Sequence, residues 1–361
     1  MSVDPVAPAV LRALTAPVER IAVFRALMLG DLLCAVPAWR AVRAAWPSAR
    51  ITLVGLAWAR PLAERLSCID DFIELPGFPG LPEVPCDVRR LPDALAQLQA
   101  RRFDLALQMH GSGEVVNPLV ACFGARHMAA FARPGVWRPA GDEELCCAWP
   151  EQGHEIERLL ALTDHLGLPR QGTSLEFPVG DDDRRALRAA WPAVDGPAYV
   201  CVHPGSQLPS RRWDPRRFAA VADALADRGL RVVLTGSAPE AGLVADVRAC
   251  MRHTPVDLCG RTDLWSLGAL LERARLLVCN DTGLSHIAAA LRVPSVVVSC
   301  GSDVARWAPL DTQRHRVLAE DMACRPCGHR VCPHEGHPCA QAVMPDAVLR
   351  AALRQLGAVC A

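Results

Sequence analysis

The chain has 361 residues, of which 51% are hydrophobic and 22% are charged. This composition is typical of a folded protein large enough for two domains, not of a disordered chain. Basic and acidic side chains both number 39, so the formal net charge is zero, which argues against a protein that works mainly by coating nucleic acid.

The N-terminal segment lacks the features of a secretory signal. Asp4 stands where a signal has basic residues, and Pro5 and Pro8 interrupt the apolar run. No apolar stretch is long enough to span a membrane. We therefore expect a cytoplasmic protein whose thiols stay reduced, so that the 16 cysteines need not form a disulfide framework.

Predicted strands and helices alternate through the first half of the chain. Apolar strands each lead into a segment with helical periodicity, which predicts a parallel, doubly wound α/β sheet. The strands are expected at 20–27, 51–55, 71–75, 103–109 and 127–132, and the helices at 32–45, 58–66, 91–101 and 155–166.

The same alternation begins again at Tyr199 and predicts a second sheet. The segment 178–183 contains Pro and Gly and ends in three acidic residues, so we expect it to link the two domains. The predicted boundaries are 1–180 for the N-terminal domain and 181–361 for the C-terminal domain. The last helix, Pro345–Leu356, is expected to pack back on the N-terminal domain.

The stretch around Asp281 is the most informative part of the chain. Leu276–Cys279 is apolar and too short for a helix, which suits a buried parallel strand. Asp281, Thr282 and Gly283 follow where the next helix begins, and Asp and Thr are favoured N-cap residues. A helix N-terminus at the carboxyl edge of a parallel sheet is partly positive and suits a diphosphate. An ordinary capped helix has the same local pattern.

Two further strands end in Gly/Ser turns, at 203–206 and 235–237. The chain carries in order the segments FRALMLGDLL, HPGS, RRW, LTGSAPE, LCGRTDL and NDTGLSHIAAAL. This pattern resembles glycosyltransferase family nine, the ADP-heptose:lipopolysaccharide heptosyltransferases, over about residues 20–345. NDTGLSH is its most specific part.

The resemblance implies a GT-B architecture, in which two Rossmann-like domains face each other across a cleft. It also implies an inverting transferase that moves a heptose-like sugar from an ADP-sugar to a lipopolysaccharide core or a related glycan. The C-terminal domain would bind the nucleotide sugar and the N-terminal domain the acceptor. Neither a metal nor another cofactor is expected.

Gly30 and Asp31 follow the first predicted strand. Gly30 permits a sharp turn, and Asp31 then begins the next helix. Glycosyl transfer needs a base that removes the proton of the acceptor hydroxyl, and the general base of the family matches Asp31. Without the resemblance, an N-cap that holds the helix is the simpler explanation.

Ser206, Arg211 and Arg212 are candidates for binding the diphosphate, whose negative charge grows as the donor bond breaks. The family places a basic residue, most often Lys, two positions before the Trp. Arg211 matches it and keeps the charge, but Arg differs from Lys in geometry. Two solvated arginines on a loop are the alternative.

Gly236, Glu240 and His286 complete the predicted substrate-binding residues. The family places a Glu on the nucleotide ribose, and Glu240 matches it. A Glu in the first turn of a helix also complements the helix dipole. His286 is a candidate for contact with the phosphates or the sugar, although a lone His in such a helix is as readily structural.

Four cysteines near the C-terminus, at 324, 327, 332 and 339, have the spacing C-x2-C-x4-C-x6-C with three interspersed His residues. This spacing resembles a zinc or iron–sulfur ligand set. Comparable segments recur in the resembled family, whose catalysis is regarded as metal-independent. A structural metal, a disulfide and reduced loop thiols all remain open for these cysteines.

Arginines of the first half are expected to bind an anionic sugar-lipid acceptor, which allows transient association with the inner membrane surface. Unrelated surface arginines are an equal alternative. The candidates are Arg25, Arg60, Arg133 and Arg138.

The main alternative function is a nicotinamide-dependent oxidoreductase, which needs G-x-G-x-x-G after a strand. The nearest match, Gly111–Val116, lacks the third Gly. A metal-binding module would explain only the cysteine-rich segment. A glycosyltransferase with another donor and acceptor also fits the sequence.

Overall fold

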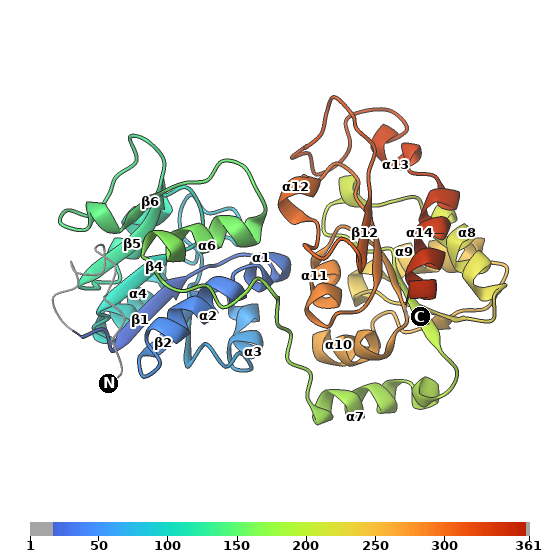
Figure 1. Ribbon diagram of the computed structural model, residues 1–361, viewed down its shortest axis with the longest axis horizontal. Helices are drawn as coiled ribbons and strands as arrows, with labels where there is room; N and C mark the ends of the chain where they lie inside the picture. The colour runs from blue at the N-terminus through green and yellow to red at the C-terminus, as the bar shows by residue number, and fades with distance from the viewer. Residues whose placement is uncertain (1–16, 359–361) are drawn as a thin grey trace. The chain divides into compact units, whose positions relative to one another are not determined.

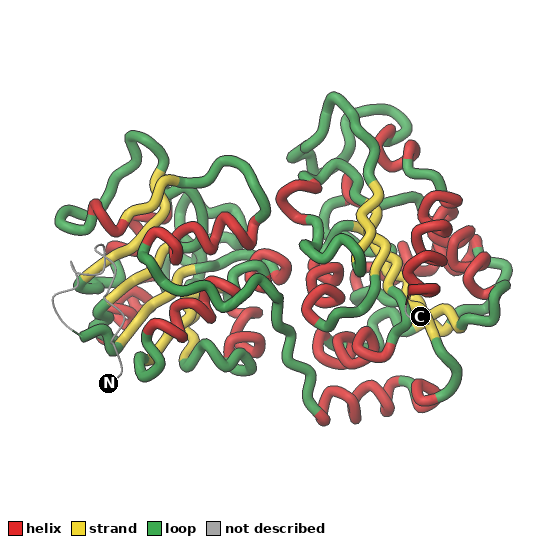
Figure 2. Tube along the Cα trace, in the orientation of Figure 1, coloured by secondary structure: helices red, strands yellow, loops and turns green. Residues whose placement is uncertain are grey.

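The computed structural model describes residues 17–358, and the chain divides into two compact units between Leu175 and Glu176 (Figure 1). Each unit, within the described residues, contains a six-stranded sheet whose paired strands all run parallel. Helices lie on both faces of each sheet (Figure 2). The predicted α/β class with two doubly wound parallel sheets is confirmed.

The sheet of the first unit has the strand order β3-β2-β1-β4-β5-β6. Its strands are β1 Arg20–Phe24, β2 Arg50–Gly55, β3 Asp71–Glu74, β4 Leu105–Gln108, β5 His127–Ala132 and β6 Cys146–Ala148. Its helices are α1 Leu29–Leu33, α2 Val36–Ala45, α3 Arg60–Ala63, α4 Leu91–Ala100, α5 Val116–Ala121 and α6 Glu155–His165. The strand order reverses between β1 and β4, and in open α/β sheets ligands bind beyond the carboxyl ends of the strands at such a point.

The sheet of the second unit repeats this topology in the order β12-β11-β10-β7-β8-β9, with the reversal between β7 and β10. Its strands are β7 Tyr199–His203, β8 Arg231–Leu234, β9 Val256–Asp257, β10 Leu277–Asn280, β11 Ser295–Val298 and β12 His315–Leu318. Its helices are α7 Asp181–Ala190, α8 Pro215–Ala226, α9 Ala241–Cys250, α10 Leu264–Arg273, α11 Gly283–Ala290, α12 Val304–Trp307, α13 Pro338–Ala342 and α14 Pro345–Ala358.

The strands β7, β10 and β11 of the second unit are buried along their whole length, as expected where helices cover both faces of a sheet. Val200 and Val202 of β7 point to one face and share a buried cluster with α8, α9 and α14. Cys201 points to the other face and is also fully buried. Burial raises the pKa of the Cys201 thiol, so this cysteine behaves as a small hydrophobic residue.

The helix expected at 32–45 is broken into α1 and α2 and begins earlier than predicted. Pro37, in the first turn of α2, has no N–H and cannot continue the hydrogen bonds of α1 through this point. Met28 occupies the N-cap position of α1. Gly30 and Asp31 therefore lie inside the first turn of a helix, and Asp31 is not an N-cap.

The segment 178–183, expected as a linker, contains the start of α7. Its acidic residues form the first turn of that helix, where their charge complements the helix dipole. Asp183 also accepts a hydrogen bond from the backbone N–H of Gly180 at 2.7 Å. Because α7 packs against α10 of the second unit, the change of unit lies upstream of this segment.

The last helix, expected to pack on the N-terminal domain, lies in the second unit. α14 packs against α8, β11 and β12. Its buried residues recur at helical spacing and belong to the core cluster of that unit: Val348, Ala351, Ala352 and Leu356. The apolar face of this helix is therefore buried by the sheet of the second unit.

None of the helices within residues 17–358 is both long and apolar enough to cross a lipid bilayer.

A buried histidine joins two neighbouring strands of the second unit. His315 begins β12, and its Nδ1 lies 2.8 Å from Ser295 Oγ on β11. Burial lowers the pKa of His315 to about 4, although Asp311 opposes this effect. The folded protein therefore keeps His315 neutral at a pH where the unfolded chain already binds the proton.

We expect His315 to make the second unit less stable as the pH falls from about 6.5 towards about 4. The free energy of unfolding should fall by about 1.4 kcal/mol per pH unit from this group, or about 2 kcal/mol between pH 7 and pH 5. Urea unfolding of His315→Gln at both pH values checks this, because Gln does not titrate. Equal losses of stability in the variant and the wild type would contradict it.

Candidate active site

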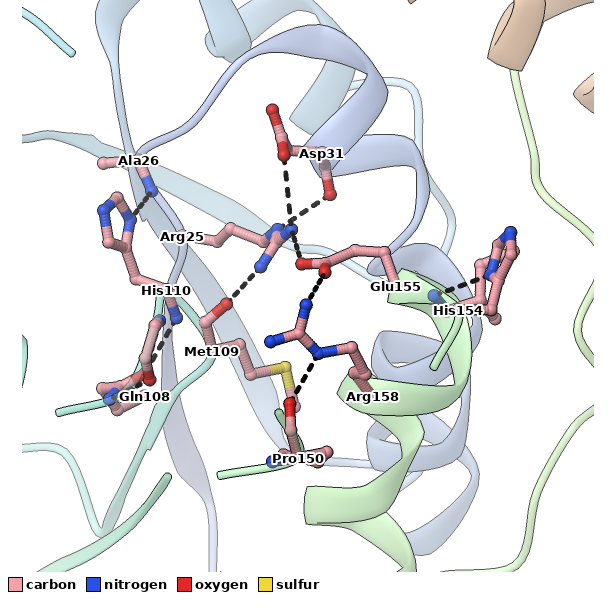
Figure 3. A network of polar contacts seen from close by, with 12 residues as sticks. Arg25, Ala26, Asp31, Gln108, Met109, His110, Pro150, His154, Glu155 and Arg158 are labelled. Carbon is pink, nitrogen blue, oxygen red and sulfur yellow. Dashed lines mark hydrogen bonds and ion pairs between the residues drawn. The ribbon is translucent and has the colours of Figure 1, made fainter. Parts of the chain in front are cut away.

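The predicted base lies at the strand-order reversal of the first unit. Asp31 sits in the first turn of α1, and its side chain is 23% exposed. Arg25, the residue after β1, donates from Nε to the backbone oxygen of Asp31 at 2.8 Å, and its Nη2 lies 4.0 Å from Asp31 Oδ1 (Figure 3). A partly exposed carboxylate thus stands beside a fixed cation.

Arg25 itself is not placed to meet an acceptor, and the prediction that it does so is wrong. Its side chain is 1% exposed and forms an ion pair with Glu155 of α6 at 3.0 Å. It also donates from Nη1 to the backbone oxygen of Met109. A buried guanidinium must be paired in this way because an unpaired buried charge is costly.

The other predicted acceptor contacts differ in their surroundings. Arg60 lies over the ring of Phe72 at 4.9 Å. Arg133 is bound by Glu151 through two hydrogen bonds of 2.6 and 2.8 Å and is partly exposed. Arg138 lies near Cys146, where its charge lowers the pKa of a thiol that burial raises.

His110, which the sequence analysis did not identify as a candidate, lies at the same carboxyl edge of the first sheet. It follows β4 and stacks on Phe24 with the ring centroids 5.0 Å apart. Its Nδ1 accepts a hydrogen bond from the backbone N–H of Ala26 at 3.1 Å, so Nε2 carries the proton and faces Glu83 Oε1 at 3.5 Å. This edge therefore brings together a histidine, an arginine and carboxylates that are far apart in sequence.

The corresponding edge of the second unit is organised by Asn280, the last residue of β10. Its buried side chain accepts from the backbone N–H of Trp213 at 2.9 Å and donates to the backbone oxygen of Pro204 at 2.7 Å. These bonds tie the loop after β7 to the end of β10. The loop that carries Ser206, Arg211 and Arg212 therefore has a defined position at the strand-order reversal.

The two adjacent arginines of this loop are held differently. Arg211 donates to the backbone oxygen of Cys300 at 3.1 Å and to that of Cys327. Arg212 donates from Nε to the backbone oxygen of Ser206 at 3.0 Å. Because a guanidinium has five N–H donors, these bonds fix both groups and leave donors for a ligand.

Glu240 lies close to the loop after β7. Ser237 donates to Glu240 Oε2 from its backbone nitrogen at 2.8 Å and from its hydroxyl at 2.7 Å. A Cβ at Gly205 would lie 2.1 Å from Glu240 Oε1 and 2.8 Å from His203 Nε2, so only glycine permits this approach. Gly236 is similarly enclosed, since a Cβ there would lie 2.9 Å from Val244.

The pKa of Glu240 and the pKa of the neighbouring His203 are both lowered. Burial alone would raise the pKa of Glu240, but the hydrogen bonds from Ser237 and the nearby His203 and Arg212 outweigh it and lower the pKa. Burial lowers the pKa of His203 against the opposing effect of Glu240. The sequence indicated Glu240 but not His203.

The helix after Asp281 opens as expected, with α11 beginning at Gly283. Thr282 occupies the N-cap position, but its side chain makes no capping hydrogen bond. Asp281 is half-buried and donates from its backbone nitrogen to Val298 at 3.0 Å. His286 is buried, and its ring packs edge-on to Trp307 at 6.4 Å, so its contact with the phosphates or the sugar stays a prediction.

The cysteine-rich segment packs on the loops at the carboxyl edge of the second sheet. Cys327 donates from its backbone nitrogen to Gly301 at 2.8 Å, and the backbone oxygen of Arg330 accepts from Ser210 at 3.1 Å. The thiols of this segment, at 324, 327, 332 and 339, are free. Among residues 17–358, no group of three or more His, Cys, Asp or Glu side chains is arranged so that it could hold a metal ion.

Comparison with known proteins gives the family of this chain. Residues 94–337 match Glycosyltransferase family 9 (heptosyltransferase), which is more than half of the chain. The chain belongs to glycosyltransferase family 9. It is therefore a glycosyltransferase, as the resemblance of its motifs implied.

Several relatives are similar over most of their length. Lipopolysaccharide heptosyltransferase 2 of Escherichia coli K12 is 28% identical over 295 residues, which cover 75% of this chain and 79% of that protein. Lipopolysaccharide heptosyltransferase 3 of the same strain is 27% identical over 290 residues, covering 78% and 82%. The structure of E. coli ADP-heptose lps heptosyltransferase II has a TM-score of 0.74 at 23% identity, covering 95% of this chain and all of that chain.

A family 9 enzyme has no need of the dinucleotide motif considered above, and Gly113 has another explanation. Its φ is +103°, and a Cβ would lie 2.6 Å from the backbone oxygen of Phe131 and 2.5 Å from the Asn117 amide. The glycine is required because α5 approaches β5 closely at this turn. The oxidoreductase alternative is therefore rejected.

Proposed function

We propose that this protein is an inverting glycosyltransferase that moves a heptose-like sugar from an ADP-sugar to a lipopolysaccharide core or a related glycan. Its relatives are named lipopolysaccharide heptosyltransferases, and a solved structure of the same fold is described as an ADP-heptose enzyme. One observation carries the proposal. A partly exposed carboxylate and a set of groups suited to a nucleoside diphosphate lie at the corresponding edges of two sheets of the same topology.

In this proposal the second unit binds the donor. Arg211 and Arg212 provide positive charge for the diphosphate, and the first turn of α11 adds N–H groups that the Thr282 side chain does not cap. The Glu240 carboxylate accepts hydrogen bonds from the ribose hydroxyls of the donor. The charge that develops on the leaving diphosphate is then met by Arg211 and the helix end, so the reaction needs no metal or other cofactor.

The first unit supplies the base. Asp31 removes the proton from the acceptor hydroxyl as this oxygen attacks the anomeric carbon and the bond to the diphosphate breaks. Arg60, Arg133 and Arg138 are at least partly exposed and are the remaining candidates for binding an anionic sugar lipid. The cytoplasmic location with transient association at the inner membrane stays a prediction.

Thermal unfolding with four nucleotides tests the donor assignment. A ligand that binds the folded state raises its stability, by about 2.7 kcal/mol at a hundred times its Kd. We expect ADP to raise the melting temperature more than UDP, GDP or NAD do. A larger shift with UDP or GDP would contradict the ADP-sugar assignment.

The same ADP titration and a transfer assay, repeated in excess chelator, test the metal-independent mechanism. We expect both the ADP shift and the turnover to persist, because Arg211 and the N-terminus of α11 supply the positive charge. Turnover that stops in chelator and returns with magnesium or manganese would overturn this part of the proposal.

A further inference from the structure

Arg25 connects three segments of the first unit at the edge that carries Asp31. Its Nε binds the backbone oxygen of Asp31 at 2.8 Å, its Nη1 binds the end of β4 at Met109, and its Nη2 binds Glu155 at 3.0 Å (Figure 3). The contact with Glu155 spans 130 positions of sequence. A planar fork with five donors can serve all three partners at once.

Glu155 lies between two arginines, Arg25 and Arg158, and forms an ion pair with each. Its side chain is 2% exposed, and its second carboxylate oxygen binds Arg158 Nη1 at 3.2 Å. Arg158 is fixed in turn by the backbone oxygen of Pro150 at 2.8 Å and lies over the ring of Trp149 at 4.4 Å. Both partners of Glu155 are therefore held in place, and so is Glu155.

The Arg25 guanidinium lies closer to the Glu155 carboxylate than to the Asp31 carboxylate. The same Nη2 atom lies 3.0 Å from Glu155 Oε1 and 4.0 Å from Asp31 Oδ1. An arginine in full contact with a carboxylate holds it strongly as the ionised form and makes it a weak base. Glu155 takes the close contact, so Arg25 holds Asp31 through its backbone oxygen while the guanidinium stays 4.0 Å from the Asp31 carboxylate.

We propose that Arg25 and Glu155 are positioning residues for Asp31: Arg25 holds the α1 turn, and Glu155 keeps the Arg25 guanidinium from closing on the Asp31 carboxylate. The inference rests on the proposed role of Asp31 as the base. It assigns a function to Glu155, which in the sequence is only an acidic residue at the start of a helix.

Two sets of substitutions test this role with ADP-heptose as the donor and a truncated lipopolysaccharide core as the acceptor. Arg25→Lys keeps the charge but replaces the fork by a single ammonium. The double change Glu155→Gln with Arg158→Gln removes one charge of each sign, which avoids leaving an unpaired buried charge. We expect both to lower kcat about tenfold with unchanged KM for the donor, because misplacing a reacting group slows chemistry without altering donor binding.

The same substitutions in an Asp31→Asn background separate positioning from a general structural effect. If Arg25 and Glu155 act through Asp31, they should lower the residual rate there by less than about twofold, because the effects of coupled residues do not add. A tenfold loss in this background as well would overturn the inference. Arg50→Lys, which alters an exposed pair with Asp71 at the opposite edge of the same sheet, is the matched control and should keep wild-type turnover.

The outcomes also distinguish this inference from the proposed function. If Asp31→Asn alone keeps wild-type turnover, the assignment of the base is wrong. If Asp31→Asn is inactive while folded Arg25→Lys and Glu155→Gln/Arg158→Gln turn over normally, the base stands and the positioning role is wrong.

Discussion

Replacing Asp31 by Asn is expected to lower the rate of sugar transfer by ~10²–10⁴-fold, the usual cost of removing a general base. Asn has nearly the same shape but cannot take up the proton of the acceptor hydroxyl. The fold should persist, because Arg25 bonds the backbone oxygen of Asp31 and not only its carboxylate. ADP affinity should also persist, because the proposed nucleotide contacts belong to the second unit.

Steady-state transfer and calorimetric ADP titration of the same protein sample check this result. Asp181→Asn removes an exposed carboxylate from the first turn of α7 and should leave both measurements unchanged. Turnover of Asp31→Asn within a few-fold of the wild type would exclude Asp31 as the base. A parallel loss of ADP affinity would indicate that the substitution acts on the donor site instead.

Arg211→Met is expected to weaken ADP binding by ~10–100-fold, the equivalent of one hydrogen bond between charged groups. Transfer should slow at least as much, because the charge on the diphosphate grows as the sugar leaves. Arg211→Lys should retain part of the affinity, since it keeps the charge without the fork. Arg212→Met should have the smaller effect.

Arg211 also joins the loops at Cys300 and Cys327, so its loss could act through the fold. Thermal unfolding without ligand distinguishes the two effects. Arg216→Met, an exposed arginine in the first turn of α8, is the matched control and should keep the ADP affinity of the wild type. Unchanged ADP affinity in a folded Arg211→Met protein would contradict the phosphate assignment.

Local sequence was sufficient for β1 to β5 of the first sheet, though not for β6, and for β7, β8 and β10 of the second. Short apolar runs followed by Gly, Ser, Asp or Thr predict buried parallel strands with polar carboxyl ends, and β7, β8 and β10 have this form. The parallel arrangement brings those ends to one edge, because a right-handed crossover returns each strand in the same direction. Among the donor-side candidates, Asp281 follows from its place after β10, whereas Arg211 and Glu240 were indicated by the resemblance to the family, and their roles stay predictions.

The exact positions at which the helices begin and end were harder to predict from the sequence. The helix after β1 begins at Leu29, so Gly30, which was expected to form a turn, lies with Asp31 in the first turn of α1. The acidic run at 181–183 resembles a linker in composition, yet it begins α7, because the same residues complement a helix dipole. Composition does not distinguish these two uses of an acidic run.

Only the tertiary structure decided which side chains meet across long stretches of sequence. Arg25 is a charged residue that was expected to contact an acceptor. Nothing near it in sequence indicates that it will be buried in an ion pair with Glu155 at the start of α6. The last helix shows the same limit: its apolar face is evident from its periodicity, but α8 and β11 decide where that face is buried. Periodicity indicates that a helix face is buried, whereas the partner that covers this face depends on the packing of elements that are far apart in the sequence.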